Sequence, residues 1–214
     1  NDLRKYPRTI DEDIKKCEAE EVDIVFTPDV AEIYPEPDTR IFDFGNLDKV
    51  MEGKFRPGHF NGVAQVVSKL FDIIKPDRAY FGQKDFQQLA IVKKMVKDLS
   101  IPTEIIACPT VRENDGLAMS SRNVLLNPNQ RASASLISKT LNEARNKKEE
   151  LSVKRMVDWV EQEINSNPLL KVEYFEIVDA QTLEQVDSWN QTRDVVGCIA
   201  VQVGEVRLID NIIF

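Results

Sequence analysis

A short polar segment, Gly82-Gln83-Lys84-Asp85, combines residue types that could bind a phosphate group. It lies between a predicted strand and a predicted helix that begins near Phe86, and open parallel sheets bind ligands beyond such strand ends. The first turn of that helix offers unpaired N–H groups with a partial positive charge, and Lys84 adds a full positive charge. Gly82 would let the backbone approach a ligand closely. The segment therefore indicates a phosphate site.

Gln88 lies in the first turn of the same predicted helix, on the face that carries Asp85, so its amide could point at a substrate near the helix end. The alternative is that Asp85 only caps the helix, Lys84 is a solvated lysine, and Gln87 and Gln88 are surface amides. The chain contains neither a Walker A pattern nor a G-x-G-x-x-G pattern. This segment alone is therefore suggestive and does not identify a nucleotide site.

A second polar segment, Met119-Ser120-Ser121-Arg122, follows an Asn-Asp-Gly turn at residues 114–116. Two hydroxyl groups and a guanidinium suit phosphate oxygens, and a mobile loop of this kind could close over a nucleotide. The alternative is an ordinary serine-rich linker with an exposed arginine.

The remaining candidates for acid–base or nucleophilic chemistry are one histidine and three cysteines. By composition, His59 is the first candidate for a general acid or base. Cys17, Cys108 and Cys198 are widely spaced and form no C-x-x-C pair, so a disulfide framework or a zinc site has no support. We expect the three thiols to pack as small apolar groups in a reducing cytoplasm.

The first half of the chain alternates short apolar runs with helical patterns, which is typical of parallel strands joined by crossover helices. Strands are predicted at residues 22–26, 78–81 and 103–107, and helices at residues 63–74 and 86–99. The order of strand, helix and strand from residue 78 onward predicts a right-handed βαβ unit. This unit places the first polar segment at a strand end.

The pattern changes near Val111, so we predict one domain over residues 1–110 and a second over residues 111–214. Asn127 followed by Pro128 predicts the N-cap and first position of a helix that reaches about residue 148.

A second helix is predicted at residues 153–165, with Ser152 as its N-cap. Strand-like runs occupy residues 172–178, 195–203 and 206–209, and the last two are joined across Gly204-Glu205 as a tight hairpin. The second domain is therefore expected to be a small α+β structure.

The composition excludes several classes of protein. The chain has 214 residues, 42% of them hydrophobic and 30% charged, which fits a globular enzyme and neither a membrane span nor a disordered chain. The net charge of −8 and the dispersed basic residues argue against a nucleic-acid partner.

Three longer motifs, at residues 56–63, 81–88 and 115–123, appear in this order and spacing in pantothenate synthetases. Residues 6–9 and 207–211 also resemble that family. The resemblance therefore covers the whole chain. It implies a Rossmann-like nucleotidyltransferase domain that lacks its first strands, followed by a smaller α+β domain.

Family members join pantoate to β-alanine in two steps. They first form pantoyl adenylate and pyrophosphate from ATP, and AMP is then released as the amine attacks the activated carbonyl group. The resemblance implies Mg²⁺ bridging the phosphates, with few protein ligands of its own. It also implies a cytoplasmic homodimer.

The resemblance carries functional roles to individual residues. Lys84 is the expected catalytic side chain, because it can stabilise charge that develops on the α-phosphate. Gln88 and Arg56 are expected to bind pantoate, whereas His59 is expected to shape the site and not to transfer protons. The expected ATP contacts are Gly82, Gln83, Lys84, Asp85, Val111, Met119, Ser120, Ser121 and Arg122. Many relatives have Glu where this chain has Gln83, which matters little if the contact is made by the backbone.

The family's opening segment, of the type Pro-Thr-Met-Gly-x-Leu-His-x-Gly-His, does not occur in this sequence, and neither does the following Asn-Pro-x-Gln-Phe. The chain starts with Asn1 and not with Met, so we expect it to be part of a longer protein. We expect negligible ligase activity from these 214 residues alone. Synthesis of pantothenate by the purified chain would refute this expectation.

Two alternatives remain open at the level of sequence. The chain could be another nucleotidyl-transferring enzyme, such as a cytidylyltransferase or the core of an aminoacyl-tRNA synthetase. It could also be a non-catalytic association module, because a sheet without its first strands exposes an edge that invites pairing.

Overall fold

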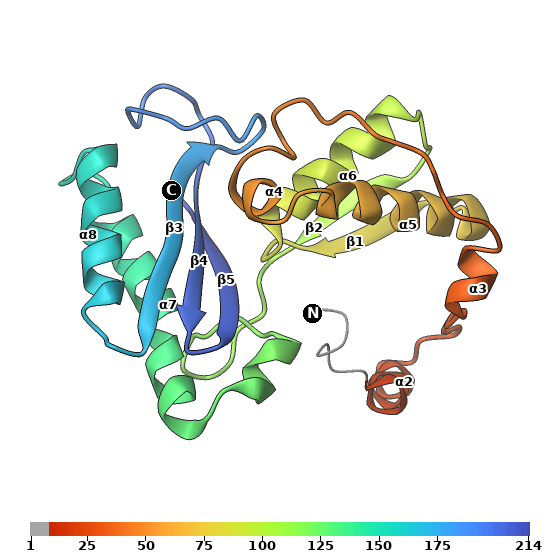
Figure 1. Ribbon diagram of the computed structural model, residues 1–214, viewed down its shortest axis with the longest axis horizontal. Helices are drawn as coiled ribbons and strands as arrows, with labels where there is room; N and C mark the ends of the chain where they lie inside the picture. Colours follow the sequence, from red (N-terminus) through yellow and green to blue (C-terminus); the bar gives the residue numbers. More distant parts are fainter. Residues whose placement is uncertain (1–8) are drawn as a thin grey trace. The chain divides into compact units, whose positions relative to one another are not determined.

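The computed structural model describes residues 9–214 (Figure 1). The chain divides into two compact units, residues 1–40 and residues 41–214, which are described separately. Of the family-like motif at residues 6–9, Tyr6, Pro7 and Arg8 lie outside the described residues. The domain limit predicted at Val111 stays a prediction.

Two helices make up the regular structure described in the first unit. Helix α2 (Ile10–Ala19) has three acidic residues in its first turn, where the helix dipole favours negative charge. Helix α3 (Val30–Ile33) opens with a capping box, in which the backbone N–H of Asp29 donates to Glu32 Oε2 at 2.6 Å.

The strand predicted at residues 22–26 is wrong, because this run has irregular backbone. A strand needs a neighbour that accepts and donates hydrogen bonds, and none of the strands described between residues 9 and 214 pairs with it. Ile24 at its centre is 83% exposed. An apolar run favours burial, but only a paired neighbour makes it a strand.

The second unit begins with two helices before its first strand. Helix α4 (Met51–Phe55) is one short turn, and helix α5 (His59–Ile74) follows it. Gly58 precedes α5 in the left-handed conformation, with φ of 79°, which glycine adopts without steric cost. The Arg-Pro-Gly-His-Phe motif is thus the joint between α4 and α5.

The predicted βαβ order is confirmed. Strand β1 (Arg78–Gly82) and strand β2 (Glu104–Cys108) pair in parallel, and helix α6 (Phe86–Asp98) connects them. The register sets Gly82 opposite Cys108. Both strands therefore end at the turn that carries Lys84.

The helices of the C-terminal half start where their caps predict. A 3₁₀ helix, η1 (Ser121–Leu125), precedes helix α7 (Pro128–Asn146), and helix α8 (Val153–Asn165) follows. The Asn127 side chain accepts from the N–H of Gln130 at 3.0 Å, and Ser152 Oγ accepts from the N–H of Arg155 at 3.4 Å.

Three antiparallel strands form the second sheet in the order β3 (Leu170–Asp179), β4 (Val195–Val203) and β5 (Val206–Ile213). The predicted tight hairpin is confirmed, with Val203 paired to Val206. Strand β5 runs to Ile213, four residues beyond the predicted end at residue 209. A register shift between Val172 and Tyr174 marks a bulge in β3.

Strand β4 is buried on both faces, because two apolar clusters meet on it. Helices α7 and α8 cover one face, where Ile199 and Val201 join their core (Figure 1). The other face carries Val196 and Cys198, which belong to a second cluster with residues of α4, α5 and α6. The second unit therefore holds the βαβ part against the C-terminal sheet.

Candidate active site

A small, partly open cavity lies between the βαβ part and the C-terminal sheet, within residues 41–214. Helix α4, the start of α5, the β1–α6 turn and all three strands of the C-terminal sheet contribute to its wall. Both its helical side and its sheet side carry polar and apolar lining residues. The charged and polar ones are Glu52, Arg56, His59, Lys84, Asp85, Gln87, Gln88, Tyr174, Asp210 and Asn211.

Within the described residues, this cavity brings together four of the predicted site residues: Arg56, Lys84, Asp85 and Gln88. The other predicted ATP contacts lie outside its lining in the part of the chain that the structure describes. They are Gly82, Gln83, Val111, Met119, Ser120, Ser121 and Arg122.

The turn that carries Lys84 is fixed by backbone hydrogen bonds. The N–H of Gln83 donates to the carbonyl of Cys108 at 2.7 Å, and the N–H of Asp85 donates to the carbonyl of Gly82 at 3.3 Å. Asp85 is the N-cap residue of α6, yet its side chain makes no capping hydrogen bond. The carboxylate therefore belongs to the cavity wall and does not serve as a cap.

The adjacent glutamines of α6 have different roles. Gln88 lines the cavity, whereas Gln87 is buried and ties α6 to the segment around α4. Its Nε2 donates to the carbonyls of Leu47 and Val50 at 2.7 and 2.9 Å, and its Oε1 accepts from the N–H of Glu52 at 3.0 Å. The interpretation of Gln87 as a surface amide is therefore wrong.

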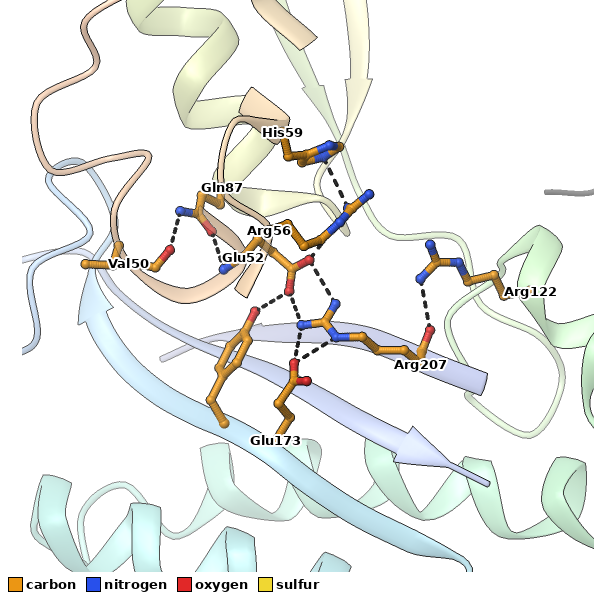
Figure 2. A network of polar contacts seen from close by, with 9 residues as sticks. Val50, Glu52, Arg56, His59, Gln87, Arg122, Glu173 and Arg207 are labelled. Atoms are coloured by element: carbon orange, nitrogen blue, oxygen red, sulfur yellow. Dashed lines mark hydrogen bonds and ion pairs between the residues drawn. The ribbon is translucent and has the colours of Figure 1, made fainter. Parts of the chain in front are cut away.

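Glu52 is the centre of a network of charged and polar side chains (Figure 2). Arg207 donates to both of its carboxylate oxygens, at 2.6 and 2.8 Å, and the Tyr174 hydroxyl donates to Oε1 at 2.8 Å. Arg207 Nε also donates to Glu173 Oε2 at 2.8 Å. The bulge in β3 re-aims this part of the strand, where two consecutive residues, Glu173 and Tyr174, reach the same network.

Pairing keeps this buried network charged. Burial raises the pKa of Glu52, but hydrogen bonds from Arg207 and its positive charge outweigh burial, so the net pKa lies below its usual value. Burial likewise lowers the pKa of Arg207, while hydrogen bonds to Glu52 and Glu173 raise it above its usual value. Burial and the Glu52 charge raise the pKa of Tyr174, which keeps its hydroxyl a donor.

The network continues to the polar side of the cavity. Arg56 NH1 lies 3.9 Å from Glu52 Oε2 and 3.2 Å from His59 Nε2 (Figure 2). A guanidinium is always protonated and only donates, so His59 Nε2 is the acceptor in this contact. That assignment puts the imidazole beside a permanent positive charge, which suits a site-shaping residue.

The second polar segment folds back on itself after β2. The N–H of Met119 donates to the carbonyl of Val111 at 3.0 Å, and an isolated bridge pairs Arg112 with Ala118. Two groups of predicted ATP contacts, Val111 and the segment from Met119, are therefore side by side.

Ser120 and Arg122 begin the next element. Ser120 Oγ accepts from the N–H of Arg122 at 3.2 Å as the N-cap of η1, a bond that does not use the O–H hydrogen. Arg122 NH1 donates to the carbonyl of Arg207 at 3.2 Å (Figure 2). The predicted phosphate-binding Arg122 is thus attached to β5, the strand that contributes Arg207 to the Glu52 network.

Sequence reasoning missed several polar residues of this cavity. Glu52 and Tyr174 stand in no recognised catalytic pattern. Asp210 and Asn211 belong to the family-like motif at residues 207–211, which suggests no role for either. A polar Asp-Asn pair inside the otherwise apolar run at residues 208–213 is the signal that could have identified Asp210 and Asn211. Glu52 carries no comparable local signal, because Tyr174 and Arg207, which hydrogen-bond its carboxylate, lie more than a hundred residues away in the sequence.

The cysteines are free thiols, and burial raises the pKa of Cys198, which lies in the cavity wall. Among residues 9–214, no group of three or more His, Cys, Asp or Glu side chains is arranged to hold a metal ion. Within the same residues, no helix has the length and apolar character needed to cross a membrane.

A family model described as pantoate-beta-alanine ligase matches residues 1–213 of the chain. Among curated proteins, a pantothenate synthetase of Bacteroides fragilis is 57% identical over 212 residues, which cover 99% of this chain and 75% of that protein. A pantothenate synthetase of Porphyromonas gingivalis is 53% identical over 211 residues, with 99% and 75% coverage.

Solved structures give the same result. Pantothenate synthetase from Thermus thermophilus matches with a TM-score of 0.93 at 41% identity, covering 99% of this chain and 77% of that one. The ligase from Francisella tularensis, solved with "Beta-gamma ATP and Beta-alanine", matches with a TM-score of 0.80 at 34% identity and covers 99% and 72%. The α/β fold with a parallel sheet and a separate antiparallel sheet is therefore shared with these enzymes.

Proposed function

The chain belongs to the pantoate-beta-alanine ligase family, and we propose that it joins pantoate to β-alanine in an ATP-consuming, AMP-forming reaction. Family membership removes the alternative of a cytidylyltransferase or a synthetase core for tRNA. The observation that carries the proposal is that Lys84, predicted for the phosphates, and Gln88, predicted for pantoate, line one cavity.

The chemistry requires an activated carboxylate, because a free carboxylate is a poor electrophile. A carboxylate oxygen of pantoate attacks the α-phosphorus of ATP, and the bond to the β-phosphate breaks to release pyrophosphate. The amine of β-alanine then attacks the acyl carbon of pantoyl adenylate, loses a proton, and AMP leaves. A site that stabilises the charge growing on the phosphates accelerates the first step most.

We assign Lys84 to the α-phosphate as the catalytic side chain. Its turn stands at the N-terminal end of α6, where the backbone dipoles favour an anion. Gly82, Gln83 and Asp85 complete the predicted ATP contacts of this turn. Two observations support these assignments: hydrogen bonds fix the backbone of the turn, and Lys84 and Asp85 lie in the cavity wall.

We assign the rest of the nucleotide contacts to the segment after β2. Val111 would meet the adenine side through its backbone, and the Met119–Arg122 stretch would close over the triphosphate. Met119 and Val111 are hydrogen-bonded neighbours, which supports a shared role. Binding of a triphosphate by Arg122 would compete with its present bond to the Arg207 carbonyl.

Pantoate is assigned to Gln88 and Arg56. Both line the cavity on its helical side, and Arg56 is held next to Glu52 and His59. A guanidinium and an amide suit the carboxylate and the hydroxyl groups of this substrate.

We propose Mg²⁺ as the metal that accompanies ATP. The donor set fits an ion bound mostly by phosphate oxygens and water, because among residues 9–214 no group of three or more His, Cys, Asp or Glu side chains could hold a metal ion by itself, while Asp85 offers one carboxylate in the cavity wall. When bound, the ion would neutralise phosphate charge. We also propose that the protein is cytoplasmic and forms a homodimer. Light scattering of the purified protein would test the homodimer.

The reaction is tested by incubating ATP, pantoate and β-alanine with the protein, both as the 214-residue chain and as the complete product of its gene. Formation of pantothenate and of AMP in equal amounts is expected from the complete gene product, and negligible synthesis is expected from the 214-residue chain alone. Release of ADP, or AMP formation that does not need pantoate, would contradict the proposal.

Two variants test the assignments within that assay. Lys84→Gln should slow pyrophosphate release by about 100-fold or more, because it removes the charge that follows the transition state. Gln88→Ala should raise KM for pantoate by roughly tenfold, the loss expected for one hydrogen bond to a charged group. Lys97→Gln, at the exposed far end of α6, is the matched control and should change neither quantity.

A further inference from the structure

Asn211 makes two hydrogen bonds into the turn that carries Lys84. Its Nδ2 donates to the carbonyl oxygens of Gln83 and Lys84, both at 2.9 Å, and the side chain is buried. Two acceptors on one side fix the orientation of the amide, because only its nitrogen can donate to both. A residue 127 positions away in the sequence therefore uses both of its amide hydrogens on this turn.

These bonds set the direction of two consecutive peptide groups. In a trans peptide the carbonyl and the following N–H point in opposite directions, and the described chain has no cis peptide bond. Holding the carbonyls of Gln83 and Lys84 on Asn211 turns the N–H groups of Lys84 and Asp85 away from it. The direction of the Lys84 side chain depends on these same two peptide planes.

Asn211 is itself held in place. Its N–H donates to Asp210 Oδ1 at 2.8 Å, and Asp210 pairs with Arg112 through two hydrogen bonds of 2.7 and 3.0 Å. Arg112 also donates to the carbonyl of Gly116 at 3.1 Å. Asp210 and Asn211 thus attach two segments with predicted ATP contacts, the Lys84 turn and the loop after β2, to strand β5.

We propose that Asn211 is a positioning residue for the ligase reaction, which orients the Lys84 turn toward the α-phosphate through its two carbonyl hydrogen bonds. The proposal rests on the proposed function. It assigns Asn211 no contact with substrate, so its loss should act through Lys84 alone.

A double-mutant cycle tests this dependence in the complete gene product. Asn211→Ala should lower kcat for pyrophosphate release by roughly 10- to 100-fold, as expected when a catalytic group is misplaced by about 1 Å. Asn211→Asp keeps the volume but offers no donor, so it should lose at least as much. In a Lys84→Gln background, Asn211→Ala should change kcat by less than about twofold. KM for pantoate should stay within about twofold in the single variants.

Hydrogen exchange supplies a readout that does not need activity. Asn211→Ala should speed exchange of the amides at residues 83–86 by about tenfold or more and leave those of α7 unchanged. Asn127→Ala, which removes the side-chain amide that caps α7, is the matched control. It should speed amide exchange at the start of α7 and leave exchange at residues 83–86 unchanged.

The outcomes separate the two proposals. If the unaltered protein forms no AMP from ATP, pantoate and β-alanine, the proposed function fails, and exchange at residues 83–86 still decides whether Asn211 holds the turn. If the protein is active, an unchanged kcat in Asn211→Ala overturns the inference. The inference is also overturned if the kcat losses of Lys84→Gln and Asn211→Ala multiply in the double variant. Unchanged amide exchange at residues 83–86 in Asn211→Ala overturns it as well.

Discussion

Gly53 lies in α4 where the helix passes the backbone of Asp48. A Cβ added at this position would stand 2.1 Å from the carbonyl oxygen of Asp48, a distance that backbone atoms cannot relieve without moving. Gly53→Ala should therefore lower the free energy of unfolding by about 2 to 4 kcal/mol and displace the adjacent Glu52. Urea unfolding followed by tryptophan fluorescence measures the change.

The same substitution at Gly62 is its control. An added Cβ there meets no other atom within 4 Å, and the residue lies inside α5. Alanine favours a helix over glycine by about 1 kcal/mol, so Gly62→Ala should stabilise the protein slightly. Equal effects of the two substitutions would show that the close approach of α4 to Asp48 does not matter.

At the level of single residues, sequence reasoning identified those whose partners are local. Lys84 and Gln88 were predicted because a strand end and a helix start flank them, and both line the cavity. Glu52 and Asn211 could not be predicted this way, because their functions depend on pairing with residues of a distant strand or turn. Local pattern locates a turn, while tertiary contacts decide what holds it.

Helix α4 and strand β5 are joined by an ion pair whose strength depends on pH. Because the pKa of folded Glu52 lies below its usual value of 4.5, its charge contributes stability above that value, and the contribution is lost as pH falls through the folded pKa. Glu52→Gln should lower the free energy of unfolding at pH 7 by about 2 to 4 kcal/mol, since it leaves Arg207 half paired in a buried site. The difference from the unaltered protein should shrink at pH 3.

Urea titrations at several pH values measure that difference. Other carboxylates with lowered pKa, such as Glu113 and Asp115 beside Arg131, titrate equally in both proteins and cancel in the comparison. Glu163→Gln, on the exposed face of α8, is the control and should give no pH-dependent difference. A Glu52→Gln effect that is constant from pH 7 to pH 3 would contradict the ion-pair account.

At the level of elements, strong local signals gave correct positions. The Asn127 and Ser152 caps and the Gly204-Glu205 turn fixed the starts of α7 and α8 and the final hairpin. The apolar run at residues 22–26 carried an equally clear strand pattern and has irregular backbone. The difference is physical: a cap or a turn forms from its own residues, whereas a strand exists only through its neighbour.

For residues 41–214 as a whole, the doubly buried strand β4 predicts one cooperative unfolding transition. Val196 and Val201 are both fully buried on β4, the first in the cluster shared with α4, α5 and α6, the second in the cluster shared with α7 and α8. Each valine-to-alanine substitution should therefore cost about 1 to 3 kcal/mol in the same transition.

The measurement follows two reporters during urea unfolding. Trp159 and Trp189 report the C-terminal half by fluorescence, and hydrogen exchange of α6 reports the βαβ part. If the apolar face around Val196 couples the halves, both reporters should shift together in Val196→Ala and in Val201→Ala. In Val201→Ala, the urea midpoint measured by tryptophan fluorescence could fall while the stability measured by hydrogen exchange of α6 stays the same. That result would mean that the halves unfold independently, with a boundary such as the one predicted at Val111. In that case the cavity between them would be free to open without loss of either core, and the Arg207–Glu52 pair would be a separable contact.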